Sequence, residues 1–445
     1  VLHGRTLTFN QNSVANFLHL GFVPAPETIY KNIYKLRPGH FAMLDKNGLI
    51  IKQWWNIENK IQESRLTNEK EIMQRLDSAV NSAVKIRLIS DVPVGTFLSG
   101  GVDSSLVSAV AARHFNGKLK TFTIGFEHAR HNEADFAEKV AKHIGSDHRV
   151  LFATDNEARE LLPDIITQYD EPFADTSAIP TMLVSRMAKK EVTVTLSGDG
   201  GDELFMGYGA HVWAKRLSQN SISLVRPISR SLLQMGNSRM RRASRLFERE
   251  SNFQSHIFSQ EQYLFSQSEV ADLLINPSIN FDAHQFTAKK LRPEEKQALF
   301  DFIYYLPDDL LTKIDRASMR YALETRVPLL DYRIAELAFN LHPNLRLNGK
   351  TGKYMLKKLL YQYVPESFFD RPKQGFSVPM HQWMTGSLKD WFETHLSESM
   401  IVKHQIVRPD YVTKLRKRFE KSSNSYLYNR IWAIAALHAW LNQNS

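Results

Sequence analysis

The sequence Phe97-Leu98-Ser99-Gly100-Gly101-Val102-Asp103-Ser104-Ser105 decides the fold that we expect, because two kinds of periodicity meet at its glycines. The residues before the glycines, Val94 to Leu98, are largely apolar, and an amphipathic pattern follows until Asn116-Gly117. This order predicts a buried strand, a tight turn and a helix. Glycines let backbone approach a ligand, and the unpaired N–H groups of a helix N-terminus bind anions. The stretch therefore predicts a phosphate site.

Polar side chains of the same loop extend this prediction. Ser99, Ser104 and Ser105 supply hydroxyl donors for an anion. Asp103 places a carboxylate beside the phosphate site, which is favourable when a hard cation such as Mg²⁺ lies between them. The loop differs from the lysine-bearing Walker pattern, since no Gly-Lys-Ser/Thr follows. A Gly-Gly turn with a serine-rich helix cap remains the simpler alternative for this stretch alone.

The composition is that of a folded chain with more than one domain. Its 445 residues suffice for two or three domains, and contents of 43% hydrophobic and 23% charged residues are ordinary. The chain contains no cysteine, which excludes disulfides, thiolate metal sites and a cysteine nucleophile within these residues. No apolar run reaches membrane-spanning length and no secretory signal is visible. We expect a cytoplasmic protein without a membrane partner.

The net charge of +10 raises the question of a polyanion partner. Part of the basic excess is a cluster of arginines: Arg230, Arg239, Arg241, Arg242 and Arg245. Such a cluster can hold RNA or an anionic substrate, but a solvated helix face is the favoured interpretation. We therefore expect no nucleic-acid partner, and the sequence leaves a homodimer open.

Three segments follow from the patterns along the chain. Residues 1–56 contain a short helix at 13–20 and a hairpin of strands 41–44 and 49–54, which buries too little to fold alone. Residues 57–206 alternate strands with helices, which predicts an α/β fold with a doubly wound parallel sheet. Residues 207–445 lose the strand signals and form a helical lobe. The helical segments expected there are 208–219, 228–236, 260–274, 294–305, 308–324, 352–363 and 426–441.

A second glycine-rich loop, from Leu196 to Phe205, also follows a predicted strand. It contains Asp199, Asp202 and Glu203, and clustered carboxylates need cations or protons to coexist. Mg²⁺ bound to nucleotide phosphates supplies such charge, whereas an acidic capping turn at a helix start is the structural alternative. In a doubly wound sheet both loops lie at the carboxyl ends of strands, where ligands bind.

The first loop resembles the SGGxDS pyrophosphate loop of ATP pyrophosphatases, and the ordered set of motifs resembles the synthetase half of the glutamine-dependent asparagine synthetases. The front of the chain, residues 21–40, is similar to the junction after the glutaminase domain of that family, so residues 1–56 are expected to be its remnant. The motifs that carry the resemblance are SGGVDSS at 99–105, TFTIGF at 121–126, YDEPFADTSAIPT at 169–181, LSGDGGDELFMGY at 196–208, LPDDLLTKIDRASMRYALETRVPLLD at 306–331, TGKYMLKKLL at 351–360 and RPKQGFSVP at 371–379.

The resemblance implies an ATP site, a magnesium site and a reaction. A substrate carboxylate, most simply that of aspartate, attacks the α-phosphorus of ATP; ammonia derived from glutamine then attacks the acyl carbon, and AMP leaves. Asp103 and Asp202 match the family's magnesium-binding carboxylates. The positions that match its nucleotide contacts are Leu98, Ser99, Gly100, Gly101, Asp103, Ser104, Ser105, Ile124, Ser197 and Gly198.

Further residues are implied to act on the acid and the adenylate. Lys373 matches a lysine that neutralises the pentavalent phosphorus, and a solvated loop lysine is the alternative. Asp199 occupies the place of a carboxylate near the adenylate that takes a proton from ammonium, where free-asparagine enzymes carry Glu. Glu203 is a substrate candidate. Asp315 and Arg316 are expected either to orient substrate or to pair with Glu324 and Arg326.

Two departures from the family pattern leave alternatives open. The family's glutaminase uses an N-terminal cysteine, which these residues lack, and the chain opens on Val1, so we expect a fragment whose front domain is lost. The sequence GDGGDELF and residues 371–379 are more similar to relatives in glycan or antibiotic pathways, which amidate a sugar acid or another carboxylate. A remoter alternative is an RNA-modifying ATP pyrophosphatase, which only the arginine cluster supports.

Overall fold

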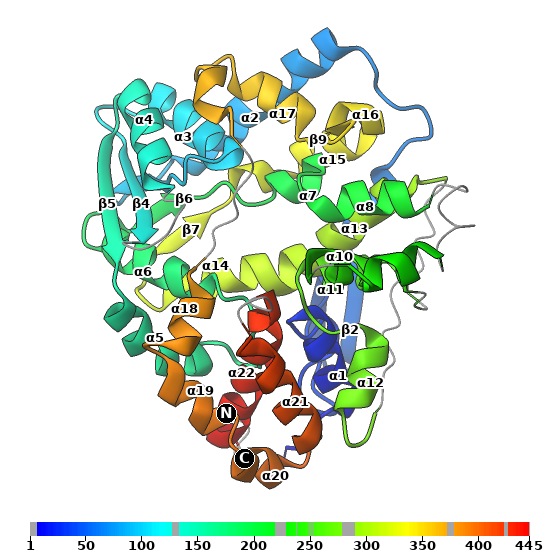
Figure 1. Cartoon of the computed structure of the whole chain (residues 1–445). Coiled ribbons are helices and arrows are strands. Elements are labelled where there is room, and N and C mark those ends of the chain that lie inside the picture. The colour runs from blue at the N-terminus through cyan, green and yellow to red at the C-terminus, as the bar shows by residue number, and fades with distance from the viewer. Residues whose placement is uncertain are drawn as a thin grey trace.

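A five-stranded parallel sheet lies between two groups of helices, on the left side of the view in Figure 1. The computed structural model describes residues 7–126, 133–218, 228–236, 238–248, 250, 252–277, 290–371, 378–421 and 426–444. The strands are β3 (Val94–Phe97), β4 (Lys120–Phe126), β5 (Asp147–Ala153), β6 (Val194–Leu196) and β7 (Glu324–Arg326). Their order across the sheet is β5-β4-β3-β6-β7, which confirms the predicted α/β doubly wound architecture.

The strands that follow β3 along the chain lie on both sides of it in the sheet. The chain first adds β4 and β5 on one side of β3, and later adds β6 and β7 on the other side. The loops that follow β3 and β6 therefore diverge from neighbouring strands, and a crevice opens between them at the carboxyl ends. Doubly wound sheets bind their ligands at such a point.

Helices cover both faces of the sheet and form two separate apolar clusters. One face packs against α2, α3, α4, α15 and α17, and the other against α5, α6, α14 and the C-terminal helices (Figure 1). The bounds are α2 (Glu69–Arg87), α3 (Val102–His114), α4 (Ala134–Ile144), α5 (Asp155–Gln168), α6 (Ala178–Lys189), α14 (Thr312–Met319), α15 (Tyr332–Asn340), α17 (Tyr354–Leu360) and α22 (Tyr428–Asn444).

The edge strand β7 corrects the prediction that residues 308–324 form one helix and that strands end near residue 206. A π-helix, η2 (Asp301–Leu311), runs into α14, and the chain then pairs Glu324–Arg326 with β6. A strand of three residues with two charged side chains has no readable alternation, so its pairing depends on the free edge of β6. Arg326 fixes the strand by donating to the carbonyls of Arg87 and Ile89.

The remaining part of the chain is mostly helical, as predicted. The segment 260–274 is two helices and not one, because Tyr263 adopts a left-handed conformation and Ser266 caps a new helix. None of the helices in the described ranges has the length and apolar character needed to cross a bilayer. The other elements are α7 (Gly201–Phe205), α8 (Gly209–Leu217), α10 (Ser238–Arg245), α11 (Phe253–Glu261), α12 (Gln267–Leu273), α13 (Pro293–Phe300), η3 (Pro328–Leu330), α16 (Pro343–Arg346), β8 (Leu347–Asn348), β9 (Thr351–Gly352), η4 (Glu366–Phe369), α18 (Met380–Thr385), α19 (Lys389–His395), α20 (Glu398–His404) and α21 (Pro409–Phe419).

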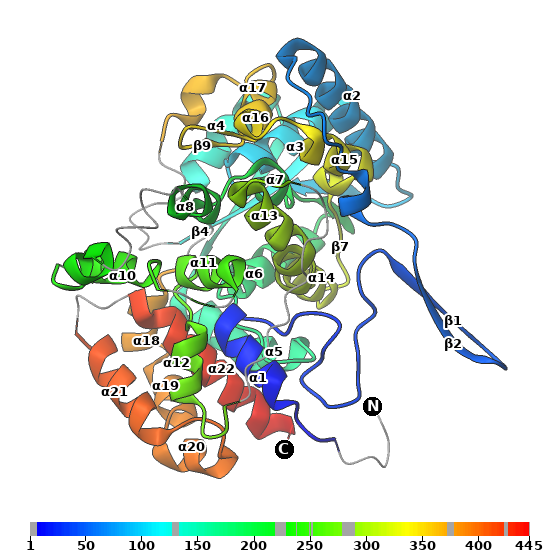
Figure 2. The ribbon, with the colours of Figure 1, turned by 90° about the vertical axis from the view of Figure 1, so that its right-hand side faces the viewer.

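The N-terminal segment consists of a buried helix and a projecting hairpin. Helix α1 (Gln11–Leu20) packs in the same apolar cluster as α22, whereas the hairpin of β1 (His40–Asp45) and β2 (Gly48–Gln53) extends away from the body (Figure 2). Its residues are exposed apart from a half-buried His40, and η1 (Ile57–Lys60) returns the chain to the body. The predicted hairpin is therefore present, and it projects from the body.

Candidate active site

A cavity of about 830 Å³ lies at the carboxyl ends of β3 and β6. Its lining comes from the loop after β3, the loop after β6, the π-helix η2 with α14, and the β8–β9 turn. The predicted site residues that line it are Leu98, Ser99, Gly100, Gly101, Asp103, Ser104, Ile124, Ser197, Gly198, Asp199, Asp202 and Glu203. The structure thus gathers both predicted loops around one space, and the roles of these residues stay predictions.

The loop after β3 is closed by its own serines. The Ser99 N–H donates to the Ser104 hydroxyl at 3.2 Å, the two hydroxyls lie 2.9 Å apart, and the Gly101 N–H donates to Ser99 at 3.3 Å. Gly100 has a φ of +72°, and a Cβ there would lie 2.7 Å from the Ala137 nitrogen. Ser105 is fully buried inside α3 and is absent from the cavity lining in the described structure.

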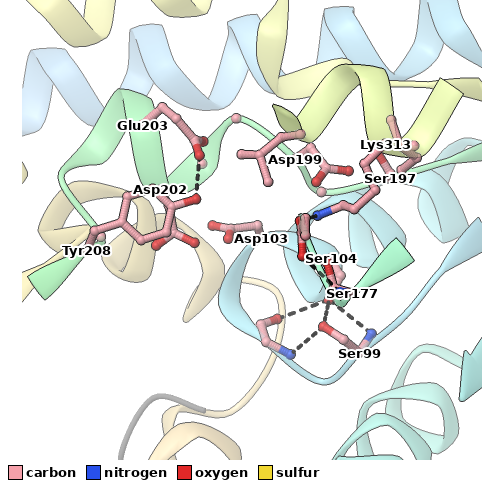
Figure 3. A pocket seen from close by; sticks show the side chains of 18 of the residues that line it. Ser99, Asp103, Ser104, Ser177, Ser197, Asp199, Asp202, Glu203, Tyr208 and Lys313 are labelled. Carbon is pink, nitrogen blue, oxygen red and sulfur yellow. Dashed lines mark hydrogen bonds and ion pairs between the residues drawn. The ribbon is translucent and has the colours of Figure 1, made fainter. Parts of the chain in front are cut away.

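The two loops touch each other through glycines. A Cβ on Gly198 would lie 2.5 Å from the backbone nitrogen of Ser104, and one on Gly201 would lie 2.2 Å from a carboxylate oxygen of Asp103. No side chain fits at either position without moving backbone or the carboxylate. The glycines therefore bring Asp103 of the first loop and Asp202 of the second to the same side of the cavity (Figure 3).

A lysine that the sequence analysis gave no role holds these two carboxylates together. The Lys353 ammonium contacts Asp103 and lies 2.8 Å from Asp202. Burial lowers the pKa of Lys353, but the charges of Asp103 and Asp202 outweigh burial and raise the pKa above its ordinary value. Lys353 is in a left-handed conformation, directly after Gly352, whose Cβ would meet the Met206 carbonyl at 2.2 Å.

The donor set around Lys353 fits a hard cation. Two carboxylates already share one positive group, and Mg²⁺ is commonly held by one or two carboxylates plus substrate phosphates. Within the described ranges no cluster of three or more His, Asp or Glu side chains is placed to hold a metal ion.

Glu203 differs from its neighbours because it is buried beneath the cavity. The Tyr208 hydroxyl donates to one carboxyl oxygen of Glu203 (Figure 3). Burial, and next the charge of Asp202, raise the pKa of Glu203 to about 8. Tyr208 is itself held by its backbone N–H, which donates to His211, and His211 lies 2.9 Å from the buried Asp301. Burial and the neighbouring carboxylate therefore favour the protonated form of Glu203.

Asp199, on the loop after β6, lies near a second group of charged side chains in the cavity. Lys313, on α14, donates to Asp175 at 2.7 Å, and Asp199 is close enough to act on the charge of Lys313 (Figure 3). Burial lowers the pKa of Lys313, but Asp175, Asp309 and Asp199 outweigh burial and raise it. This group was not predicted, although the motifs at 169–181 and 306–331 contain three of its members.

Asp315 and Arg316 are not brought to the cavity. Both are exposed, and Arg316 pairs with Asp170, while Glu324 pairs with Arg326 of its own strand. The π-helix η2 has wider turns than an α-helix, so the face that looks inward shifts along the chain. Asp309 of η2 and Lys313 of α14 line the cavity, and the expected Asp315 and Arg316 do not.

An arginine next to the predicted catalytic lysine contacts the first loop. Lys373 lies outside the described residues. Arg371, two positions earlier, donates to the Gly100 carbonyl at 3.0 Å and stacks on Phe136, with its guanidinium carbon 3.5 Å from the ring centre. Phe136 also lies against Gly100, so Arg371 and Phe136 together hold the first loop in place.

The arginine cluster gives no support to nucleic-acid binding in its described part. Arg230 pairs with Glu248, and Arg245 pairs with Glu269, which also binds Arg430. The side chains of Arg239, Arg241 and Arg242 lie outside the described residues. The described arginines therefore tie helices together.

Comparisons with known proteins agree with this geometry. The profile of the family described as asparagine synthase matches residues 75–442. "Asparagine synthetase [glutamine-hydrolyzing] 1" of Bacillus subtilis is 30% identical over 98% of this chain and 70% of its own length. "Putative asparagine synthetase [glutamine-hydrolyzing]" of Mycobacterium tuberculosis is 29% identical over 99% of this chain and 68% of its own length. A more distant relative, "Amidase chyE" of Penicillium rubens, is 23% identical over 81% and 61%.

Proposed function

Because the chain belongs to the asparagine synthase family and is a carbon–nitrogen ligase of that type, we propose that it amidates the side chain of aspartate. ATP activates the carboxylate, ammonia attacks the activated carbon, and the products are asparagine, AMP and pyrophosphate. The observation that carries the proposal is the meeting of the two glycine loops, with Asp103, Asp202 and Lys353, at the switch point of the sheet.

The first step forms an acyl–phosphate bond and breaks the bond between the α- and β-phosphates. An oxygen of the substrate carboxylate attacks the α-phosphorus, and pyrophosphate leaves. In this proposal the N–H groups at the start of α3 and the hydroxyls of Ser99 and Ser104 bind the pyrophosphate; the cavity position of both serines supports this role. Leu98 and Ile124, both buried at the cavity wall, supply an apolar surface for the base.

Cations around the first loop stabilise the charge that develops on phosphorus. Lys353, which contacts Asp103, and Arg371, which contacts Gly100, both line the cavity, and Lys373 follows Arg371 two positions later in the sequence. Asp103 and Asp202 would hold Mg²⁺, which neutralises phosphate charge when it is bound. Positioning and electrostatics supply the rate enhancement, because this chemistry needs no nucleophile from the protein.

The second step forms the amide bond. Ammonia attacks the acyl carbon, AMP takes the electron pair of the broken acyl–oxygen bond, and a proton has to leave the nitrogen. Asp199 lies between the phosphate loops and Lys313, which suits a carboxylate that accepts this proton (Figure 3). Glu203 is already hydrogen-bonded to Tyr208, and we assign it a supporting place behind Asp202.

The source of ammonia is proposed to be glutamine, as the names of the relatives indicate for those proteins. Residues 1–56 are proposed to be the end of the glutaminase domain, residues 57–206 the α/β domain and residues 207–445 its helical remainder. The exposed β1–β2 hairpin suits the first of these assignments, since its strands have an open edge and apolar residues that a neighbouring sheet would cover. A cytoplasmic location and a homodimer stay predictions.

The test supplies ammonium directly and therefore does not need a glutaminase. The folded protein is incubated with ATP, Mg²⁺, ammonium and aspartate, and AMP, pyrophosphate and asparagine are measured. We expect equal amounts of the three products, and no pyrophosphate when the acid is omitted. Absence of pyrophosphate with every acid tested would contradict the proposal. The second candidate is amidation of a sugar acid or another carboxylate, which the distant amidase relative favours, and pyrophosphate release with glucuronate and not with aspartate would select it.

A further inference from the structure

The two ends of the cavity differ in charge. We call the end at the loops after β3 and β6 the phosphate end, and the end near Asp199, η2 and α14 the acid end. Among the described residues that line the acid end, the charged ones are Asp175, Asp199, Asp309 and Lys313, and the neutral ones include Tyr305 and Gln262. Three carboxyl groups thus face one lysine. The lysines and the arginine that line the rest of the cavity, Lys350, Lys353, Lys357 and Arg371, lie around the phosphate loop and the β8–β9 turn.

Asp175 and Lys313 already satisfy each other. One oxygen of Asp175 accepts from Lys313 at 2.7 Å. The other accepts from the N–H and the hydroxyl of Ser177 at 2.8 and 2.7 Å. The charge of Lys313 is therefore engaged in a buried ion pair. It would have to leave Asp175 to bind a second carboxylate of a substrate, and separating such a pair is costly.

Asp309 lies beside Asp175 and has one carboxyl oxygen, Oδ1, that makes no hydrogen bond within the described structure. It is 5% exposed and lines the cavity. Burial, and next the charge of Asp175, raise its pKa well above the ordinary value. The buried carboxyl group is therefore stabilised by binding a cation or a proton. The π-helix η2 places it there, and π-helical segments often occur at functional sites.

We propose that Oδ1 of Asp309 binds the protonated amino group of the acid substrate, so that the enzyme selects acids that carry a free ammonium. This inference rests on the proposed adenylation chemistry and specifies its substrate class. An ammonium supplies the cation and the donors that the carboxyl group lacks. A uronic acid or a plain dicarboxylic acid brings hydroxyls or a second anion to a surface that already holds three carboxyl groups, and gains no ion pair.

The experiment compares acids that differ only in the amine. Pyrophosphate release is measured with ATP, Mg²⁺ and ammonium for aspartate and succinate, glutamate and glutarate, and 2-aminoadipate and adipate, with glucuronate as the sugar acid. We expect kcat/KM for the best amino acid to exceed that of its deaminated partner about 100-fold, because the deaminated acid leaves the buried carboxyl of Asp309 without its charged hydrogen-bond partner. D309N should lower the amino-acid value about 100-fold and leave the deaminated acid within about threefold.

The neighbouring carboxylate on the same π-helix provides a matched control. Asp308 accepts from the Ala25 N–H at 2.8 Å, faces Lys35, and is absent from the described cavity lining. D308N should therefore keep the ratio of amino acid to deaminated acid. Melting temperatures of both variants check folding.

The outcomes separate the inference from the function on which it rests. Equal kcat/KM for an amino acid and its deaminated partner, activity with glucuronate alone, or a D309N variant that lowers both acids equally would overturn the inference and leave adenylation standing. Failure of every acid to release pyrophosphate with the folded wild-type protein would instead overturn the proposed function. A ratio that collapses in D309N and survives in D308N supports the inference.

Discussion

The two ends of the cavity are built in different ways. The phosphate end comes from two short stretches, residues 99–105 and 197–203, each a loop between a strand and a helix. The acid end takes single residues from the α5–α6 connection, from the α11–α12 connection and from η2 with α14. A continuous loop can be recognised in the amino-acid sequence, whereas a binding surface made of residues from separate segments forms only when the chain folds. Relatives can therefore share the first end and differ in the second.

Both ends also place a lysine among carboxylates, with opposite consequences. Lys353 is shared by Asp103 and Asp202 and shows where a cation fits beside phosphate. Lys313 is held by Asp175, and Asp309 keeps an open oxygen next to this pair. In our proposals the phosphate end takes a polyanion with its cation, and the acid end takes a ligand that brings its own positive charge.

The largest expected effect is at the phosphate end. Asp103→Asn keeps the shape of the side chain but removes half of the negative charge that faces Lys353 and the proposed Mg²⁺. We expect kcat/KM for ATP to fall about 1000-fold, equivalent to about 4 kcal/mol of transition-state stabilisation. Pyrophosphate release under saturating acid measures it. Asp164→Asn, at a carboxylate paired with Arg320 on the surface, serves as the control. A loss below about tenfold would show that the phosphate end does not depend on this carboxylate.

The same contrast explains which features the sequence could predict. The parallel sheet and the two loops follow from local patterns, since glycines, serines and carboxylates stand next to each other between a strand and a helix. Lys353 could not be assigned, because its position depends on the β8–β9 turn passing against Met206. Asp309 and Lys313 were not predicted, because the π-helix turns other residues of this segment toward the cavity than the expected α-helix would. The strand β7 needed the edge of β6 to form.

At the acid end, the largest expected effect is on stability. Lys313→Met keeps the length of the side chain but leaves Asp175 without the cation of its buried pair. We expect the free energy of unfolding at pH 7 to fall by about 3 kcal/mol, since removing one partner strands a buried charge. Urea unfolding measures the loss. The double variant Lys313→Met with Asp175→Asn should recover part of the loss, whereas equal stability of the single variant and wild type would show that the pair is not buried in solution.

A smaller effect is expected outside both ends, at Asp331, which caps α15. Burial raises the pKa of Asp331, but hydrogen bonds from Arg333 and Arg87 outweigh it and lower the pKa from 3.8 to about 2. Because the folded pKa is the lower one, the stabilisation is present above about pH 4 and is lost as the pH falls toward 2. Asp331→Asn should cost about 1 to 2 kcal/mol at pH 7, and the difference from wild type should vanish near pH 2. A difference that persists unchanged in acid would contradict this.

The smallest expected effect is at Arg316, which decides how far the acid end extends. Its ion pair with Asp170 is on the surface, with 44% and 73% of the two side chains exposed, and such pairs contribute about 0.5 kcal/mol or less. Arg316→Ala should therefore leave kcat/KM for the acid within about twofold of wild type, as should the matched variant Arg320→Ala, whose pair with Asp164 is similarly exposed. If Arg316→Ala alone lowered kcat/KM for the acid and left that for ATP unchanged, Arg316 would contact the substrate. The acid end would then reach past Lys313 to the surface of α14, and the contrast between a local phosphate end and an assembled acid end would become sharper.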